Sequence, residues 1–137
     1  MRISEAARHS GLPDKTIRYY ESIGLLRSRR LSNGYRDYSS EDVQALQFLR
    51  RARDLGFSID DCRSLLALHD DPARASSDVK QVATQRLKAI EAKLSELYLM
   101  QRTLEQLVEQ CPGDDSPDCT ILEGLDGPLE SETAPHR

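Results

Sequence analysis

A long heptad repeat in the second half of the chain constrains the fold more than any other feature. Between residues 83 and 108, core positions recur at alternating steps of four and three, which is typical of a coiled-coil helix. One core position holds Ala83, Ile90, Leu97 and Leu104, and the other holds Leu87, Leu94, Gln101 and Val108. The repeat therefore predicts a mainly α fold with a dimerisation helix.

This helix requires a partner, because its apolar stripe would otherwise lie in water. A helix of about 35 residues is about 50 Å long, too long to be covered by the small domain that precedes it. A second copy of the chain is the simplest partner, so we expect a homodimer. An antiparallel pair would place the end of one helix beside residues 76–80 of the other chain, whereas a parallel pair would bring the two ends together. The heptads are compatible with both.

A loop with a cysteine at each end follows the helix. Its sequence is Cys111-Pro-Gly-Asp-Asp-Ser-Pro-Asp-Cys119, in which the prolines and the glycine stop the helix and fold the chain back. The two thiols are therefore expected to meet at the helix tip. Thiolates select Cu(I) over harder ions, whereas Zn(II) prefers four ligands and this loop offers two soft ones. We predict a site for a monovalent soft metal.

Other chemistries of this loop stay open. Asp114, Asp115 and Asp118 could add oxygen ligands for a divalent ion, although next to prolines they also suit turns. The two thiols could instead form a disulfide and act as a redox switch. We find no nucleophile–base pair, phosphate-binding loop or carboxylate pair at a useful spacing, so we do not expect an enzyme.

Composition and charge indicate where the chain works and what it binds. The 137 residues contain no signal peptide and no run of 18 apolar residues, so we expect a cytoplasmic protein with no membrane partner. Residues 1–53 carry 11 Lys+Arg against 6 Asp+Glu, whereas residues 54–137 carry 8 against 17. The basic first half is therefore the candidate for binding a polyanion.

Two short helices are expected at the start of the chain. Ser4 suits the cap of the first, Gly11 and Pro13 break the chain, and Asp14 suits the cap of a second helix that ends near Ser22. Two such helices joined by a tight turn form a helix-turn-helix, whose second helix would carry the DNA contacts. The candidates are Lys15, Thr16, Arg18, Tyr19 and Tyr20. Alternatively, Ile17 and one of the tyrosines belong to the core and the rest form a solvated face.

An arginine-rich segment follows this pair of helices. Residues 26–38 contain four arginines around Asn33-Gly34, and this dipeptide between extended runs indicates a β-hairpin with a two-residue loop. A basic hairpin after a helix-turn-helix is a wing, from which Arg27, Tyr35 and Arg36 would grip the DNA backbone. The alternative is an ordinary soluble surface loop.

Two more helices are expected before the long one. Ser39 to Asp42 opens the third, Gly56 ends it, and Ser58 caps the fourth. Cys62 lies on the apolar face of the fourth helix and is expected in the core rather than in a metal site. The resulting division is a winged helix-turn-helix domain with a second helix pair (1–70), a hinge and dimerisation helix (71–110), a metal-binding loop and short helix (111–125) and a disordered tail (126–137).

This order of parts resembles the MerR family of bacterial transcription activators over nearly the whole chain. The segments that carry the resemblance are residues 3–7, 16–21, 24–26, 33–38 and 50–58, together with the long helix. Within the family, Asp71-Pro72 and residues 76–80 and 111–119 resemble the copper-efflux regulators, which sense monovalent copper, silver and gold.

The resemblance implies a homodimer with an antiparallel coiled coil, bound to promoter DNA with an overlong spacer. Such a dimer would activate transcription by distorting the DNA so that RNA polymerase can engage both promoter elements. The implied effector is Cu(I), with Ag(I) or Au(I) as alternatives. Divalent-metal or thiol-redox sensing by a regulator of the same family is the other reading of the cysteine pair.

In an antiparallel dimer, the start of the partner's long helix would complete the metal site. Cu(I) bound by the thiolates of Cys111 and Cys119 leaves one negative charge, which Lys80 and the free N–H groups of that helix would offset. Ser76 stands where relatives that sense divalent ions have a cysteine, and it withholds a third thiolate. The Cys/His cluster that ends some relatives is absent from this sequence.

Overall fold

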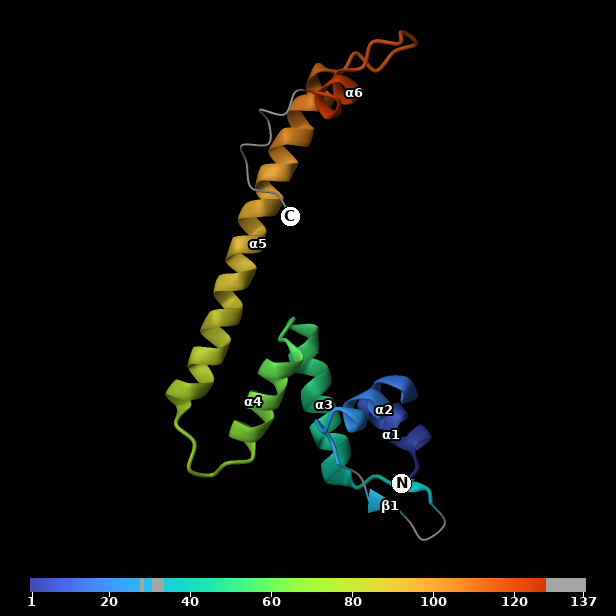
Figure 1. Cartoon of the computed structure of the whole chain (residues 1–137), viewed down its shortest axis with the longest axis vertical. Coiled ribbons are helices and arrows are strands. Elements are labelled where there is room, and N and C mark those ends of the chain that lie inside the picture. The colour runs from blue at the N-terminus through green and yellow to red at the C-terminus, as the bar shows by residue number, and fades with distance from the viewer. Residues whose placement is uncertain (28, 31–33, 128–137) are drawn as a thin grey trace. The chain divides into compact units, whose positions relative to one another are not determined.

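The structure is a computed structural model that describes residues 1–27, 29, 30 and 34–127 (Figure 1). It contains α1 (Ile3–Ser10), α2 (Asp14–Ser22), β1 (Arg29–Arg30), β2 (Arg36–Asp37), α3 (Ser40–Asp54), α4 (Ile59–His69), α5 (Ser76–Gln110) and α6 (Thr120–Leu125). The chain forms two compact units, Met1–Leu87 and the part that begins at Lys88, which we describe separately. None of the described helices is long and apolar enough to cross a membrane.

The first two helices form the expected pair, but each begins in a different way from the prediction. Helix α1 starts at Ile3 after Arg2, whose carbonyl accepts the first helical hydrogen bonds, so the predicted cap at Ser4 is wrong. Helix α2 starts at Asp14 because the carbonyl of Pro13 plays the same part, and Asp14 is the first helical residue rather than the cap. Gly11 ends α1 with a φ of 78°, as expected for a glycine at a helix end.

The wing is a two-stranded antiparallel hairpin. Arg29 pairs with Asp37 and Arg30 with Arg36. This register is centred on residue 33, whereas a two-residue loop of Asn33 and Gly34 would require a centre between them. The register of the described strands therefore differs by one residue from the one that this loop predicts, and Asn33 itself lies outside the described residues.

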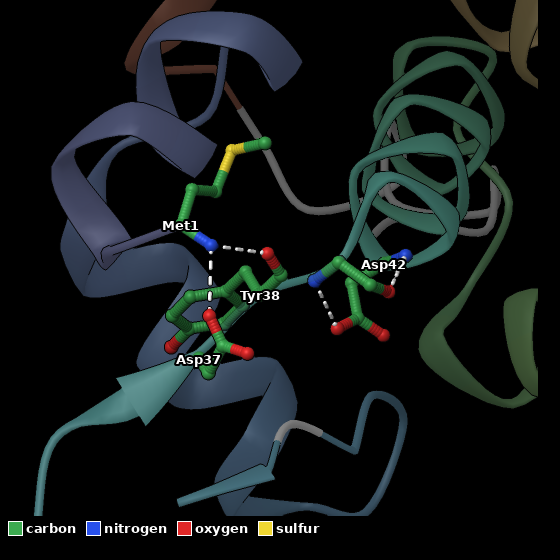
Figure 2. Close-up of polar contacts among 5 residues, drawn as sticks. Met1, Asp37, Tyr38 and Asp42 are labelled. Atoms are coloured by element: carbon green, nitrogen blue, oxygen red, sulfur yellow. Dashed lines mark hydrogen bonds and ion pairs between the residues drawn. The ribbon is translucent and has the colours of Figure 1, made fainter. Parts of the chain in front are cut away.

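The starts of α3 and α4 match the sequence. The hydroxyl of Ser39 accepts a hydrogen bond from the Asp42 N–H at 3.1 Å, and the Asp42 carboxylate accepts one from the Ser39 N–H at 2.8 Å (Figure 2). Ser58 likewise accepts the Asp61 N–H at 3.0 Å. These local capping pairs fix both helix starts without help from distant residues.

The core of the first unit lies between α1–α4 and the base of the wing. Helices α1 and α4 both pack on α3. The buried apolar residues are Ala6, Ile17, Tyr20, Leu25, Leu26, Tyr38, Val43, Leu46, Leu49, Ala52, Phe57 and Cys62. The prediction that Cys62 is buried is confirmed, since its exposed fraction is 0%.

The first turns of α5 belong to the same unit. Val82 packs against the core, and Nε of Arg86 donates a hydrogen bond of 2.9 Å to the carbonyl of Leu55, directly before Gly56. Gly56 has a φ of 84°, and the guanidinium of Arg86 occupies the space where a side chain at residue 56 would lie. Arg86 therefore ties α5 to the turn between α3 and α4.

In the second unit, α6 folds back onto the end of α5. The Thr120 hydroxyl donates a hydrogen bond of 2.9 Å to the carbonyl of Gln110. Gly124 lies so close to Leu107 that a Cβ at residue 124 would be 2.5 Å from Cδ2 of the leucine. Because Gly124 has no side chain, α6 can lie close to α5 at this point. The close packing of α6 also holds Cys119, which directly precedes it, against α5.

Candidate nucleic-acid interface and candidate metal centre

Helix α2 divides the five candidate DNA contacts between an exposed face and the core. Lys15, Arg18 and Tyr19 are exposed, and Thr16 is half-buried. Tyr20 is only 4% exposed and packs in the core beside Ile17, which is fully buried. The alternative in which Ile17 and one tyrosine are core residues therefore holds, and that tyrosine is Tyr20, which is too buried for a direct DNA contact.

Two wing residues share one carboxylate on α2. A guanidinium nitrogen of Arg36 lies 3.1 Å from Oε1 of Glu21, and the Tyr38 hydroxyl donates a hydrogen bond of 2.6 Å to the same oxygen. Burial, followed by this hydrogen bond to Glu21, raises the pKa of Tyr38 to about 12. Arg36 is one-third exposed, so it both braces the wing against α2 and presents part of its guanidinium to solvent.

The first residue of the chain is hydrogen-bonded to the second wing strand and its extension. The Met1 amine lies 2.9 Å from a carboxylate oxygen of Asp37 and donates a hydrogen bond of 2.7 Å to the carbonyl of Tyr38 (Figure 2). The Tyr38 N–H donates in turn to the Met1 carbonyl at 2.7 Å. These contacts hold the start of α1 beside the wing.

Arg2 is a residue of this surface that the sequence analysis missed. Its guanidinium carbon lies 4.0 Å from the centre of the Tyr35 ring, and both residues are exposed. Arg27 is also exposed. The basic residue directly before the first helix was the available signal for Arg2, but its contact is with Tyr35, which is distant in the sequence.

The two loop cysteines lie together in the second unit, as the sequence predicted. Their sulfur atoms are 3.9 Å apart, and both thiols are free and half-buried. Cys119 directly precedes α6; its side chain makes no capping hydrogen bond, yet the backbone N–H groups of Leu122 and Ile121 lie close enough to lower its pKa. The nearby thiol of Cys111 lowers the pKa of Cys119 further. This environment favours a thiolate, which is the form that binds soft metals.

Asp114, in the loop between the two cysteines, is hydrogen-bonded to the backbone of the same loop. Oδ1 of Asp114 accepts a hydrogen bond of 2.9 Å from the Ser116 N–H, which lowers the pKa of Asp114. Gly113 precedes it with a φ of 66°. Asp114 thus acts as a turn residue here. The described residues contain no cluster of three or more His, Cys, Asp or Glu side chains with metal-site geometry.

The heptad positions of α5 form an exposed apolar stripe. Leu87, Leu94, Leu97, Leu104 and Val108 are each between 48% and 61% exposed in the single chain. In the second unit, Leu97, Leu104 and Val108 line a groove of about 620 Å³ together with Met100. Ser76 and Lys80, at the start of α5, are also exposed.

Comparisons with known proteins place this architecture in one family. The family described as MerR HTH family regulatory protein matches residues 1–68, and the one described as MerR, DNA binding matches residues 43–107. The HTH-type transcriptional regulator HmrR of Rhizobium leguminosarum bv. viciae is 57% identical over 125 residues, covering 91% of this chain and 97% of its own. The regulator CueR of Salmonella typhimurium is 44% identical over 128 residues, covering 93% of each chain.

A solved structure agrees with these sequence matches. The transcription regulator PbrR691 from Ralstonia metallidurans, solved in complex with lead(II), superposes with a TM-score of 0.79 at 34% identity and covers 91% of this chain and 98% of its own. Family, relatives and fold therefore coincide over nearly all of the sequence. The chain belongs to the MerR family of helix-turn-helix transcriptional regulators and is not an enzyme.

Proposed function

We propose that the chain is a metal-responsive transcriptional activator whose effector is Cu(I), with Ag(I) or Au(I) as alternatives. The observation that carries the proposal is the pair of free thiols of Cys111 and Cys119, 3.9 Å apart at the end of α5. Thiolates are the ligands that select Cu(I). The names of the relatives agree with a metal effector, since two of them are called heavy metal-dependent transcription regulators.

The spacing of the two thiols suits a small soft ion. Two metal–thiolate bonds of about 2.3 Å each span about 4.6 Å when they lie in line. The observed separation of 3.9 Å is within 1 Å of that span, so a small opening of the loop would suffice. The lowered pKa of Cys119 supports binding because less free energy is needed to deprotonate the thiol.

Dimerisation would complete the site. The stripe that includes Leu94 and Leu97 is about half exposed in one chain, and an antiparallel coiled coil with a second chain would bury it. In that arrangement the start of the partner's helix, with Ser76 and Lys80, lies beside the loop. The same residues of the chain's own helix cannot reach the loop, because a helix of 35 residues has its two ends about 50 Å apart. Lys80 and the N–H groups at the helix start would offset the negative charge of the occupied site.

The first unit would bind promoter DNA. We propose that α2 contributes Lys15, Thr16, Arg18 and Tyr19, and that the wing contributes Arg27, Tyr35 and Arg36. Five of these seven side chains are exposed, and Thr16 and Arg36 are half-buried, which supports this role. Activation would follow from distortion of an overlong promoter spacer, after which RNA polymerase engages both promoter elements. The division into segments 1–70, 71–110, 111–125 and 126–137 is part of this proposal.

Divalent sensing is the second candidate, because PbrR691 was solved with lead(II). The two candidate functions require different ligands at residue 76. A serine hydroxyl is a poor ligand for soft ions, so Ser76 leaves two thiolates, whereas a cysteine there would supply a third.

The test is in vitro transcription from a promoter that the protein binds, under reducing conditions, with Cu(I), Zn(II) or Hg(II). We expect Cu(I) to induce the unmodified protein, and we expect Cys111→Ser and Cys119→Ser to abolish induction while leaving DNA binding intact. Ser76→Cys should add a response to divalent ions. Cys62→Ala is the matched control, because it removes a thiol buried in the other unit and should keep full induction.

Each outcome bears on one part of the proposal. Full Cu(I) induction of either loop variant would refute the site. Strong Zn(II) induction of the unmodified protein would refute monovalent selectivity. Induction by oxidant without metal would favour a redox switch. Titration against a competing Cu(I) chelator should give one ion per loop.

A further inference from the structure

A small pocket opens in the first unit between the start of α1, helix α2 and the wing. It has a volume of about 250 Å³, and an arginine from each of these three parts lines it: Arg2, Arg18 and Arg36. Tyr35 of the wing also contributes to the wall. At about 30 Å³ per water molecule the space holds about eight waters, which is room for a phosphate group with part of its hydration shell.

The Arg2 side chain is oriented by two sets of contacts. Its guanidinium carbon lies over the Tyr35 ring, 4.0 Å from the ring centre. An arginine in such a cation–π contact can still donate hydrogen bonds from its N–H groups. The preceding residue is fixed because Met1 exchanges hydrogen bonds of 2.7 Å with the backbone of Tyr38. The edge of a guanidinium held in this way can bind two oxygens of one phosphate.

The charges around the pocket leave it positive. Glu21 faces it from α2 and pairs with Arg36, while Asp37 pairs with the Met1 amine. Within the described ranges, neither Arg2 nor Arg18 has a carboxylate at ion-pairing distance. Two of the arginines that line the pocket, Arg2 and Arg18, therefore remain without a counter-ion among the described residues.

We propose that this pocket seats a phosphate of the DNA backbone and that Arg2 is a DNA contact that braces the wing through Tyr35. The inference rests on DNA binding by this unit and adds a contact from the residue before α1 to those of α2 and the wing. A backbone contact fixes the register of the protein on the duplex and carries no sequence information of its own.

The experiment measures the affinity of the dimer of this 137-residue chain for a promoter duplex and for an unrelated duplex, by fluorescence anisotropy over a range of salt concentrations. Each lost phosphate contact lowers the slope of log affinity against log salt by about 0.9, so Arg2→Ala should lower it by about 1.8 per dimer. The loss of affinity should be the same on both duplexes. Arg2→Lys keeps the charge and should keep the slope, but it should weaken binding because the planar stack on Tyr35 is lost.

Arg8→Ala is the matched control, since Arg8 is an exposed arginine in the last turn of α1, the helix that Arg2 precedes, and it does not line the pocket. If Arg2→Ala and Arg8→Ala change the slope equally, the pocket is refuted while DNA binding stands. If the unmodified protein shows no salt-dependent binding, DNA binding itself fails. Circular dichroism checks that all variants are folded.

A second arm separates DNA phosphate from a soluble anion. Duplexes in which single phosphates are replaced by uncharged methylphosphonates should bind the unmodified protein more weakly at each contacted phosphate. At one of these positions per half-site, the phosphate seated in the pocket, Arg2→Ala should cause no further loss. The proposal is overturned if Arg2→Ala abolishes binding of inorganic phosphate, followed by NMR, but leaves every methylphosphonate effect unchanged.

Discussion

Gly56 should be the glycine of the first unit whose replacement costs most, because it combines a left-handed backbone with a crowded space. Its φ is 84°, and a Cβ at this position would lie 2.6 Å from Cζ of Arg86. A non-glycine residue in this region of φ costs about 1–2 kcal/mol. Relief of the clash requires Arg86 to move and to give up its hydrogen bond to the Leu55 carbonyl, which adds about 0.5–1 kcal/mol for an exposed bond. Gly56→Ala should therefore lower the free energy of unfolding by about 1.5–3 kcal/mol.

Gly24 is a matched control for this prediction. Its φ is 76°, and the carbonyl of the preceding Ile23 also accepts a hydrogen bond from an arginine, Arg63, at 3.0 Å. A Cβ at residue 24 would lie 4.0 Å from the nearest Arg63 nitrogen, which is ordinary van der Waals contact. Gly24→Ala should therefore cost only the backbone term, about 1–2 kcal/mol.

Urea denaturation at one fixed protomer concentration measures these differences, because the stability of a dimer depends on concentration. The double variant Gly56→Ala with Arg86→Ala closes a mutant cycle. It should be more stable than the sum of the two single effects allows, since removal of Arg86 also removes the clash. The reasoning is refuted if Gly24→Ala costs as much as Gly56→Ala and the cycle is additive.

Three further predictions concern the wing, the stripe and the last helix. Burial and the Glu21 hydrogen bond raise the pKa of Tyr38 from 10.0 to about 12. The stability that its neutral hydroxyl contributes is therefore complete below pH 10 and is lost between pH 10 and about 12. Tyr38→Phe should reduce that alkaline loss of stability in pH titrations followed by circular dichroism. Leu94→Asp combined with Leu97→Asp would bury charge in the dimer seam and should give monomers in analytical ultracentrifugation, whereas a persistent dimer would place the interface elsewhere. Gly124→Ala should clash with a leucine of α5 and destabilise the packing of α6 by about 1–3 kcal/mol, which lowers Cu(I) affinity in chelator competition; unchanged affinity would show that α6 does not position the loop.

Features that depend on neighbouring residues could be predicted from the sequence. The starts of α3 and α4 are set by Ser39 and Ser58, each bonded to a residue three positions later. The meeting of Cys111 and Cys119 follows from the prolines and glycine between them. Such interactions are visible in a short window because both partners lie inside it.

Features that depend on distant partners could not be predicted. The ion pair between Arg36 and Glu21 joins residues 15 positions apart, so a residue interpreted as a free wing arginine is also a brace. The register of the hairpin differs by one residue from the one that Asn33-Gly34 predicts, because the pairing of the strands decides it and the turn dipeptide alone does not. The role of Arg2 depends on its stacking against Tyr35 in the folded wing. In each case tertiary contacts decide what the local pattern leaves open.

The reactivity of the three cysteines can be used to follow two separate events, metal binding by the loop and opening of the first unit. Cys62 is fully buried and its pKa is raised by burial, whereas Cys119 is partly exposed and its pKa is lowered. Alkylating reagents attack thiolates, so a mass spectrum taken after a short pulse would show modification at the loop first and at Cys62 only after the first unit opens. The mass added at the loop cysteines would thus record occupancy of the loop, and the mass added at Cys62 would record opening of the DNA-binding unit, in one sample that needs no engineered probe.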